Sequence, residues 1–348
     1  MRPPPELPID ILPNIIAHLV KDDANTLFSC LLVSRIWCRL IIPILWRNPF
    51  HYTDYLKKES TREEKQSKII DVYISCLSAD AKKRLKDRTD IKILLSLSSS
   101  KRLFNYPKYI SSLDDKRILC AVWDWKLKRE PSIDGHDVYH LLFALIRMFA
   151  EESQSLQHLS LNSCFYDKSM DRKKKFSPKD SFPSLSSSPS ESSRKILLVD
   201  IYSAIASSQR KFKTICVSKA NALSPEEAMI ETTQIVTIIK AQGKYLTEFT
   251  ISSCKYGLDE IIDALRFGAT AKSLRSLTFN GCDFAQLSSP QIATTVEFFS
   301  RMENVLFRMC HGYKGEFLDA LEKKMVLDHS VGGFVTNIEA REKPSKEA

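Results

Sequence analysis

Side chains that could perform chemistry are sparse in this sequence. His136 and His140 lie one helical turn apart, as two ligands of one metal would, but no second pair of ligands has matching local spacing. The acidic pairs Glu151-Glu152 and Asp22-Asp23 are typical of solvated turns and helix ends rather than of acid–base partners. No GxSxG or HExxH motif occurs, and the nine cysteines include no CxxC pair. We therefore expect no catalytic residue, no bound metal and no cofactor.

Glycine and cysteine usage narrow the class of protein further. Only nine glycines occur in 348 residues and the first is Gly135, so the first third holds no glycine-rich phosphate loop, and the later glycines are too scattered for one. The odd cysteine count, the apolar surroundings of several cysteines and the lack of an opening signal peptide predict reduced thiols in a cytoplasmic and/or nuclear protein. Apolar stretches such as 40–46 are far shorter than the roughly 18–20 residues that span a bilayer, so we expect no membrane contact.

The positive charge is concentrated in one part of the chain. The net charge is +9, and residues 57–130 contribute 19 basic and 11 acidic side chains, a surplus of +8. This segment is either a solubilising connector with one helix within 57–97, or a contact for nucleic acid or another acidic partner. Aromatic and basic residues occur together in 101–130. The aromatic residues could stack on nucleic-acid bases, or they could pack as a strand-like edge against a neighbouring domain. We favour a solubilising connector for the segment as a whole and packing against a neighbouring domain for its aromatic residues.

Residues 7–46 keep a helical period of apolar residues, which predicts three short helices. Asp10 is expected to cap the first helix, placing Pro13 in its first turn. The second helix should follow Asp23 or Asn25, and Ser34 should cap the third, which Pro43 should end. Three helices of forty residues cannot bury this much Leu, Ile and Trp alone. Either a partner or the rest of the chain must cover the remainder.

The motifs of this segment resemble the F-box, a helical module that docks on the Skp adaptor of cullin-based ubiquitin ligases. The resemblance rests on Leu7-Pro8, Val33-Ser34-Arg35, Trp37 and Pro43-Ile44-Leu45-Trp46, which fall in register over about forty residues. Pro13, and Asp10 where glutamate is commoner, depart from the pattern. The resemblance implies a set of adaptor contacts, with Leu40 and Trp46 assigned instead to the module core. These contacts are Leu7, Pro8, Ile11, Ile15, Leu31, Val33 and Trp37.

Five segments align without gaps on the template LxxLxLxxC. They are LQHLSLNSC (156–164), FKTICVSKA (212–220), LTEFTISSC (246–254), LRSLTFNGC (274–282) and MENVLFRMC (302–310). An amphipathic stretch precedes each one, so strands and helices should alternate, as parallel strands require. The pattern resembles an irregular leucine-rich-repeat solenoid over roughly 137–326, with a helix from about 315 to 326 closing its end.

Along each repeat strand the template residues should face the interior and the intervening ones the concave face. That face is mostly small and polar, which suits a hydrogen-bonding surface for a target protein as well as any solvated sheet. The candidate target-binding residues are His158, Ser160, Asn162, Thr214, Ser218, Glu248, Thr250, Ser252, Ser276, Thr278, Asn280, Asn304 and Arg308.

The sequence thus predicts an α/β chain with an N-terminal three-helix F-box followed by an irregular leucine-rich-repeat solenoid. The expected divisions are 1–56 for the F-box, 57–136 for a basic, partly helical connecting region, 137–326 for the repeats with a disordered insertion at 168–193, and 327–348 for a flexible tail. The resemblance implies a non-catalytic substrate receptor that binds a Skp-family adaptor, through it a cullin, and an unknown target protein. The alternative is a basic repeat scaffold that binds nucleic acid or another anionic partner.

Overall fold

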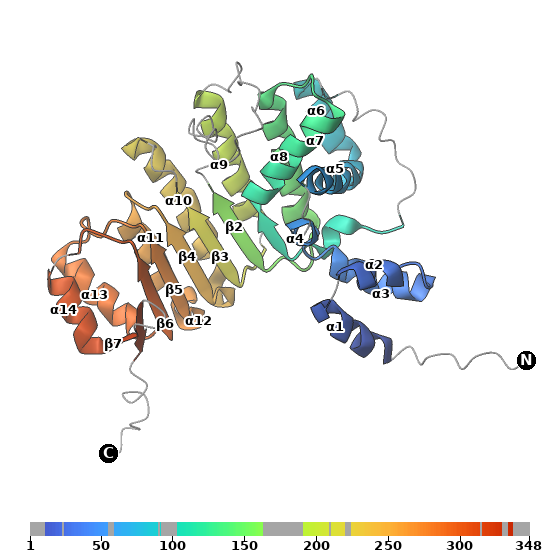
Figure 1. The fold of residues 1–348 in the computed structure, drawn as a ribbon. Coiled ribbons are helices and arrows are strands. Elements are labelled where there is room, and N and C mark those ends of the chain that lie inside the picture. Colours follow the sequence, from blue (N-terminus) through green and yellow to red (C-terminus); the bar gives the residue numbers. More distant parts are fainter. Residues whose placement is uncertain are drawn as a thin grey trace, which may run out of the picture.

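The computed structural model describes residues 11–22, 24–54, 59–89, 91, 103–162, 191–208, 210–219, 224–313, 315–328 and 333–336. Three N-terminal helices project from one end of a larger body, in which a sheet is lined by helices (Figure 1). No helix among these residues is long and apolar enough to cross a membrane.

The N-terminal module consists of α1 (Leu12–Asp22), α2 (Ala24–Cys30) and α3 (Arg35–Leu45). Its small core is formed by one apolar side of each helix and contains the buried residues Ile16, Leu27, Ile41 and Leu45. Pro13 lies in the first turn of α1, as predicted, while the expected cap Asp10 lies outside the described residues. Helix α2 follows residue 23, also as predicted.

Helix α3 begins as expected but ends later. Ser34 caps it, because its Oγ accepts the backbone N–H of Trp37 at 3.4 Å. The prediction that Pro43 ends the helix was wrong, since α3 continues through Pro43 to Leu45. Proline removes only one intrahelical donor, and the N–H of Trp46 still donates to the carbonyl oxygen of Ile42 at 3.0 Å. Burial of the last turn offsets the lost bond.

The described residues between 51 and 129 include helices α4 (His51–Asp54), α5 (Glu59–Cys76), α6 (Ala79–Arg88) and α7 (Asp115–Arg129), a 3-10 turn η3 (Tyr106–Tyr109) and strand β1 (Ser112–Asp114). Where the sequence suggested a connecting region, α5 and α7 pack against each other and share the main core of the body. Tyr73 and Trp125 are fully buried there. Strand β1 pairs with β2 at the edge of the sheet, but the aromatic residues expected to form a strand-like edge lie elsewhere, with Tyr106 in η3 and Trp125 in α7.

The sheet contains the five predicted repeat strands in one parallel register. They are β2 (His158–Asn162), β3 (Thr214–Ser218), β4 (Glu248–Ser252), β5 (Ser276–Asn280) and β6 (Asn304–Arg308). With β1 they form six neighbouring parallel strands, and each repeat strand covers the same five template positions. Parallel strands alternating with helices are therefore confirmed, and the arrangement is consistent with a leucine-rich-repeat-like solenoid.

Helices connect the strands and lie along one face of the sheet (Figure 1). They are α8 (Gly135–Glu152), α9 (Glu191–Ser207), α10 (Pro225–Gln242), α11 (Leu258–Arg266), α12 (Thr270–Ser273) and α13 (Ser289–Phe299), with a short 3-10 turn η6 (Gly243–Tyr245). Capping boxes at Ser224 and Ser288 fix the starts of α10 and α13. Most of the expected insertion 168–193 lies outside the described residues, and its last three residues begin α9.

The C-terminal end of the sheet is covered by a helix and a hairpin. Helix α14 (Gly315–Lys324) matches the predicted closing helix. Strands β7 (Met325–Asp328) and β8 (Gly333–Thr336) follow, where the sequence suggested a flexible tail from 327. Strand β8 pairs antiparallel with β6, so the hairpin satisfies the backbone groups of what would otherwise be an open edge.

Candidate protein-binding surfaces

Large apolar side chains are exposed where α2 passes into α3. The exposed fractions are 48% for Phe28, 88% for Leu32, 63% for Val33 and 43% for Ile36, and these four residues are called the apolar face below. Ile11, just before α1, is also exposed. Several large apolar side chains exposed within nine residues make this turn a candidate interaction surface. Of the four residues of the apolar face, only Val33 is among the adaptor contacts predicted from the sequence.

Of the other predicted adaptor contacts, Ile11 is exposed as well, and the rest lie deeper or outside the described residues. Leu31 and Trp37 are half-buried and pack against the module core, and Ile15 is half-buried on α1. Leu7 and Pro8 lie outside the described residues. The contacts implied by the resemblance therefore include half-buried positions and omit Phe28, Leu32 and Ile36, since exposure in the folded module depends on how the three helices pack.

The body contacts the N-terminal module at the end opposite to the apolar face. The ring of Trp46, just after α3, lies 5.3 Å from the ring of Tyr73 and 4.2 Å from that of Tyr106. The N–H of Ser111 donates to the carbonyl oxygen of Arg47 at 2.9 Å, and Phe50 is buried in the body core. These contacts anchor the C-terminal end of α3, while the turn between α2 and α3 points away from the body (Figure 1).

The second candidate surface is the sheet face that does not carry the helices, called the open face below. Along β2 to β5 buried and partly exposed residues alternate, as predicted, so the template residues form the core. In β6 the alternation is weaker, because Phe307 is only half-buried. The predicted target-binding residues all lie on this face in matching register: His158, Ser160, Asn162, Thr214, Ser218, Glu248, Thr250, Ser252, Ser276, Thr278, Asn280, Asn304 and Arg308.

Exposure on the open face differs between its residues. His158, Glu248, Asn304 and Arg308 are exposed, whereas the hydroxyl and amide residues between them are half-buried. Glu248 accepts a hydrogen bond from the Thr214 hydroxyl at 3.3 Å. The row therefore presents short hydrogen-bonding groups, with an exposed carboxylate on β4 and an exposed guanidinium on β6.

Asp115, the first residue of α7, orders one end of the open face. Its carboxylate accepts the backbone N–H of Asn162 at 3.0 Å and the Asn162 side-chain N–H at 3.3 Å. Burial raises the pKa of Asp115 to about 7, although the bonds from Asn162 oppose the shift. Nothing in the sequence around Asp115 marked it, because its partner lies 47 residues away.

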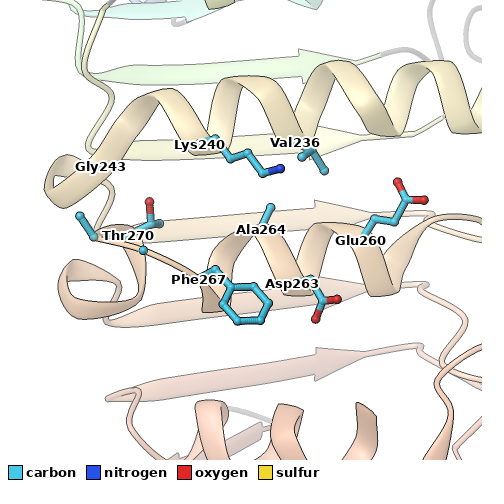
Figure 2. Close-up of a pocket in the computed structure, with 10 residues that line it drawn as sticks. Val236, Lys240, Gly243, Glu260, Asp263, Ala264, Phe267 and Thr270 are labelled. Carbon is cyan, nitrogen blue, oxygen red and sulfur yellow. The ribbon is translucent and has the colours of Figure 1, made fainter. Parts of the chain in front are cut away.

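A pocket of about 620 Å³ opens on the helix-covered side, between α10 and α11. Figure 2 shows Val236 and Lys240 of α10 on one side of it and Glu260 and Ala264 of α11 on the other, while the side chain of Asp263 points away from α10. Phe267, just after α11, also lines the pocket and is 64% exposed. Sequence patterns did not indicate this pocket, which arises because α11 is much shorter than α10.

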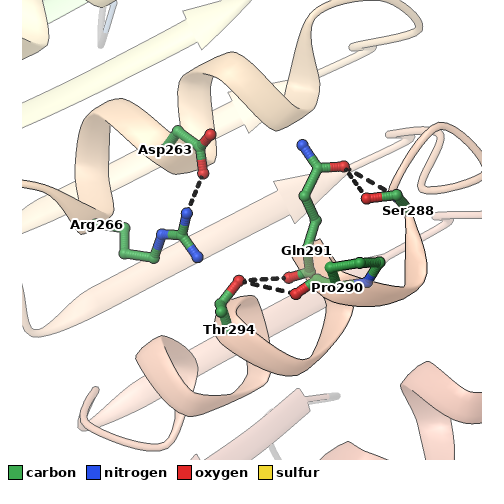
Figure 3. Close-up of polar contacts among 6 residues, drawn as sticks. All are labelled: Asp263, Arg266, Ser288, Pro290, Gln291 and Thr294. Carbon is green, nitrogen blue, oxygen red and sulfur yellow. Dashed lines mark hydrogen bonds and ion pairs between the residues drawn. The ribbon is translucent and has the colours of Figure 1, made fainter.

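Polar contacts hold the wall of this pocket in place. The Arg266 guanidinium donates to Asp263 Oδ1 at 2.8 Å (Figure 3) and lies 4.7 Å from the centre of the Phe267 ring. The neighbouring helix α13 is fixed by Ser288, whose hydroxyl and N–H both contact Gln291 Oε1, at 2.8 and 2.9 Å. The Asp263–Arg266 ion pair therefore orders the α11 side of the pocket, whereas Ser288 and Gln291 lie outside its lining.

Groups suited to metal binding do not converge in the described part of the chain. His136 and His140 do stack, with ring centres 4.8 Å apart, and burial lowers the pKa of His140. Within the described ranges no three His, Cys, Asp or Glu side chains are placed to share a metal ion. The apolar face and the open face are the candidate surfaces taken further below.

Comparison with known proteins identifies one part of the chain. Residues 5–52 match the F-box-like family and constitute an F-box-like domain. No curated protein matches the sequence. No solved structure matches the chain either.

Proposed function

We propose that this protein is the substrate-receptor subunit of an SCF-type cullin ubiquitin ligase. Its F-box-like domain would bind a Skp-family adaptor, and the adaptor would link it to a cullin. The open face would hold a target protein for ubiquitin transfer by another subunit. In this role the protein positions its target and performs no catalysis itself, in the cytoplasm, the nucleus or both.

The observation that carries this proposal is the uncovered apolar face. Leu32 is 88% exposed although it lies in a module with a packed core. The body could have covered it but contacts the module through Trp46 and Phe50 instead. Burying the apolar face against another protein would be favourable at about 25 cal/mol per Å² of apolar surface.

The open face supports the target-binding half of the proposal. Its five repeat strands share one register. Glu248 at the start of β4 and Arg308 at the end of β6 are exposed on it. Holding a target beside the transferring enzyme would raise the effective concentration of its lysines, which accounts for a receptor that needs no active site.

The alternative of nucleic-acid binding through 57–130 finds less support. Several basic residues of this segment are used in ion pairs, including Lys128 with Glu63 at 3.2 Å and Arg129 with Asp71 at 2.9 Å. Two aromatic residues of the segment, Tyr73 and Trp125, are fully buried, and the Trp125 indole N–H donates to Asp71. Base stacking needs exposed rings.

A pull-down of a Skp-family adaptor by the full chain tests the proposal. The variant Leu32→Asp combined with Val33→Asp should lose the adaptor, because two charges would be buried in the interface. Leu103→Asp is a matched control, since Leu103 is 89% exposed but belongs to the body, and it should retain binding. Binding by the folded double variant would reject the site.

The dependence of binding on salt concentration distinguishes the adaptor-binding proposal from the nucleic-acid-binding alternative. An apolar helical interface should persist when the ionic strength rises, whereas a complex that rests on phosphate contacts weakens steeply. Tight binding to nucleic acid that disappears with salt, without any adaptor binding, would favour the alternative.

A further inference from the structure

Cysteines occupy the same position at the ends of three consecutive repeat strands. Cys254, Cys282 and Cys310 are each 28 residues apart and each follows its strand by two residues. Cys282 and Cys310 lie between two pairs of matched residues. Asn280 pairs with Arg308 two positions before the cysteines, and Asp283 bridges to His311 one position after them. Cys282 and Cys310 are therefore direct neighbours across the sheet.

The two sulfur atoms share a local network. Cys310 Sγ accepts the backbone N–H of Cys282 at 3.4 Å, and the two thiols are hydrogen-bonded to each other. The hydroxyl of Tyr313 also contacts Cys310 Sγ. Cys282 is fully buried, whereas Cys310 is half-buried at the last repeat strand and so can be reached from solvent.

This network distinguishes Cys310 from the other thiols. The hydrogen bond from the Cys282 thiol lowers the pKa of Cys310, while the same contact together with burial raises the pKa of Cys282. Burial raises the pKa of Cys254, and it also raises that of Cys216, which is half-buried like Cys310. Thiolate character at a solvent-accessible sulfur is what makes a cysteine reactive.

The other groups near Cys310 leave its pKa lower than those of the neighbouring cysteines. Tyr313 has its own pKa raised by burial, so it remains a neutral donor to the sulfur. His311 and Asp283 face each other at 3.7 Å at the next position along the chain. Arg308 contributes its carbonyl oxygen, 3.4 Å from Cys310 Sγ.

We propose that Cys310 is a site of reversible oxidation that closes a disulfide with Cys282. A hydroperoxide is the oxidant. The Cys310 thiolate attacks its outer oxygen, the O–O bond breaks, and a sulfenic acid forms at Cys310 while water or an alcohol leaves. The Cys282 sulfur then attacks Cys310 Sγ, and the Cys282 proton leaves with the hydroxyl group as water. A thiol reductant restores both cysteines.

The backbone permits this bond. Neighbouring strands lie about 4.8 Å apart, within the range of roughly 4.4–6.8 Å between Cα atoms that disulfides span. The side chains already contact each other, so closure requires rotation of the side chains rather than movement of a strand.

The unmodified chain provides the first test. It is labelled briefly with iodoacetamide across a pH series, and each cysteine peptide is quantified by mass spectrometry. Cys310 should reach half of its maximal labelling at a lower pH than Cys216, which has similar burial. The native chain is next treated with hydrogen peroxide, alkylated and digested. A Cys282–Cys310 linked peptide that reductant removes is expected.

Two variants test which cysteine forms the sulfenic acid and which closes the disulfide. Cys282→Ser should stop at the sulfenic acid, which a cyclic 1,3-dione traps at Cys310. Cys254→Ser is the matched control and should still form the linked peptide. Equal labelling profiles for Cys310 and Cys216 in the unmodified chain would overturn the proposal, as would peroxide products that leave Cys282 and Cys310 unlinked.

Discussion

Truncation of Leu32 gives a quantitative test of the apolar face. In Leu32→Ala three side-chain carbons are removed from a residue that is 88% exposed in the isolated chain. If the adaptor buries them, at about 0.8 kcal/mol per buried methylene, the variant loses about 2 kcal/mol of binding free energy. This corresponds to an adaptor dissociation constant raised roughly 30-fold.

The same variant should keep its stability, because the Leu32 side chain lies mostly in solvent in the folded chain. Isothermal titration of the purified chain with a Skp-family adaptor measures the affinity, and thermal unfolding measures stability. Leu103→Ala provides the control, since its exposed fraction is 89% and its position is on the body. An affinity change below about threefold for folded Leu32→Ala, equal to that of the control, would refute the reasoning.

Three further predictions concern the module core, a buried acid and the open face. Leu27→Ala should lower the free energy of unfolding of the module by about 2–5 kcal/mol, because Leu27 is fully buried; an unchanged denaturation midpoint for the module would contradict this. The raised pKa of Asp115, about 7 against an ordinary 3.8, means that the folded chain binds the proton more tightly than the unfolded chain. Its contribution to stability is thus present at low pH and is lost as the pH rises from about 4 to 7. Asp115→Asn should therefore flatten the dependence of the melting temperature on pH across this range, and an identical profile for the variant would argue against the assignment. Finally, Glu248→Ala with Arg308→Ala should reduce capture of targets, measured by proximity labelling with the proteasome inhibited, without lowering the melting temperature; intact capture would place the target elsewhere.

The repeat strands were predictable because their chemistry is periodic and local. The template LxxLxLxxC gave the bounds of all five repeat strands and their shared register, since each unit buries its leucine positions in the same way. The Ser34 cap of α3 was equally readable from its position before an apolar stripe.

Features that depend on distant partners were not predictable. Strand β1 has only three residues, and its pairing with β2 depends on helices on either side. The β7–β8 hairpin is defined by pairing with β6 rather than by its own pattern. The continuation of α3 past Pro43 depends on packing of its last turn, which a rule about single residues omits.

The candidate site was predictable in location but not in detail. The resemblance to the F-box placed a partner surface in residues 7–46, and the family match over 5–52 agrees with it. Which side chains remain exposed depends on how three helices pack, so Phe28, Leu32 and Ile36 emerged only from the fold.

Amide hydrogen exchange of the full chain with and without a Skp-family adaptor tests the central claim most directly. Binding at the apolar face should slow exchange in residues 28–36 and leave strands β3 to β5 unchanged, also at high salt. Undiminished exchange of 28–36 in an adaptor-saturated sample, or protection confined to 57–130, would contradict the account.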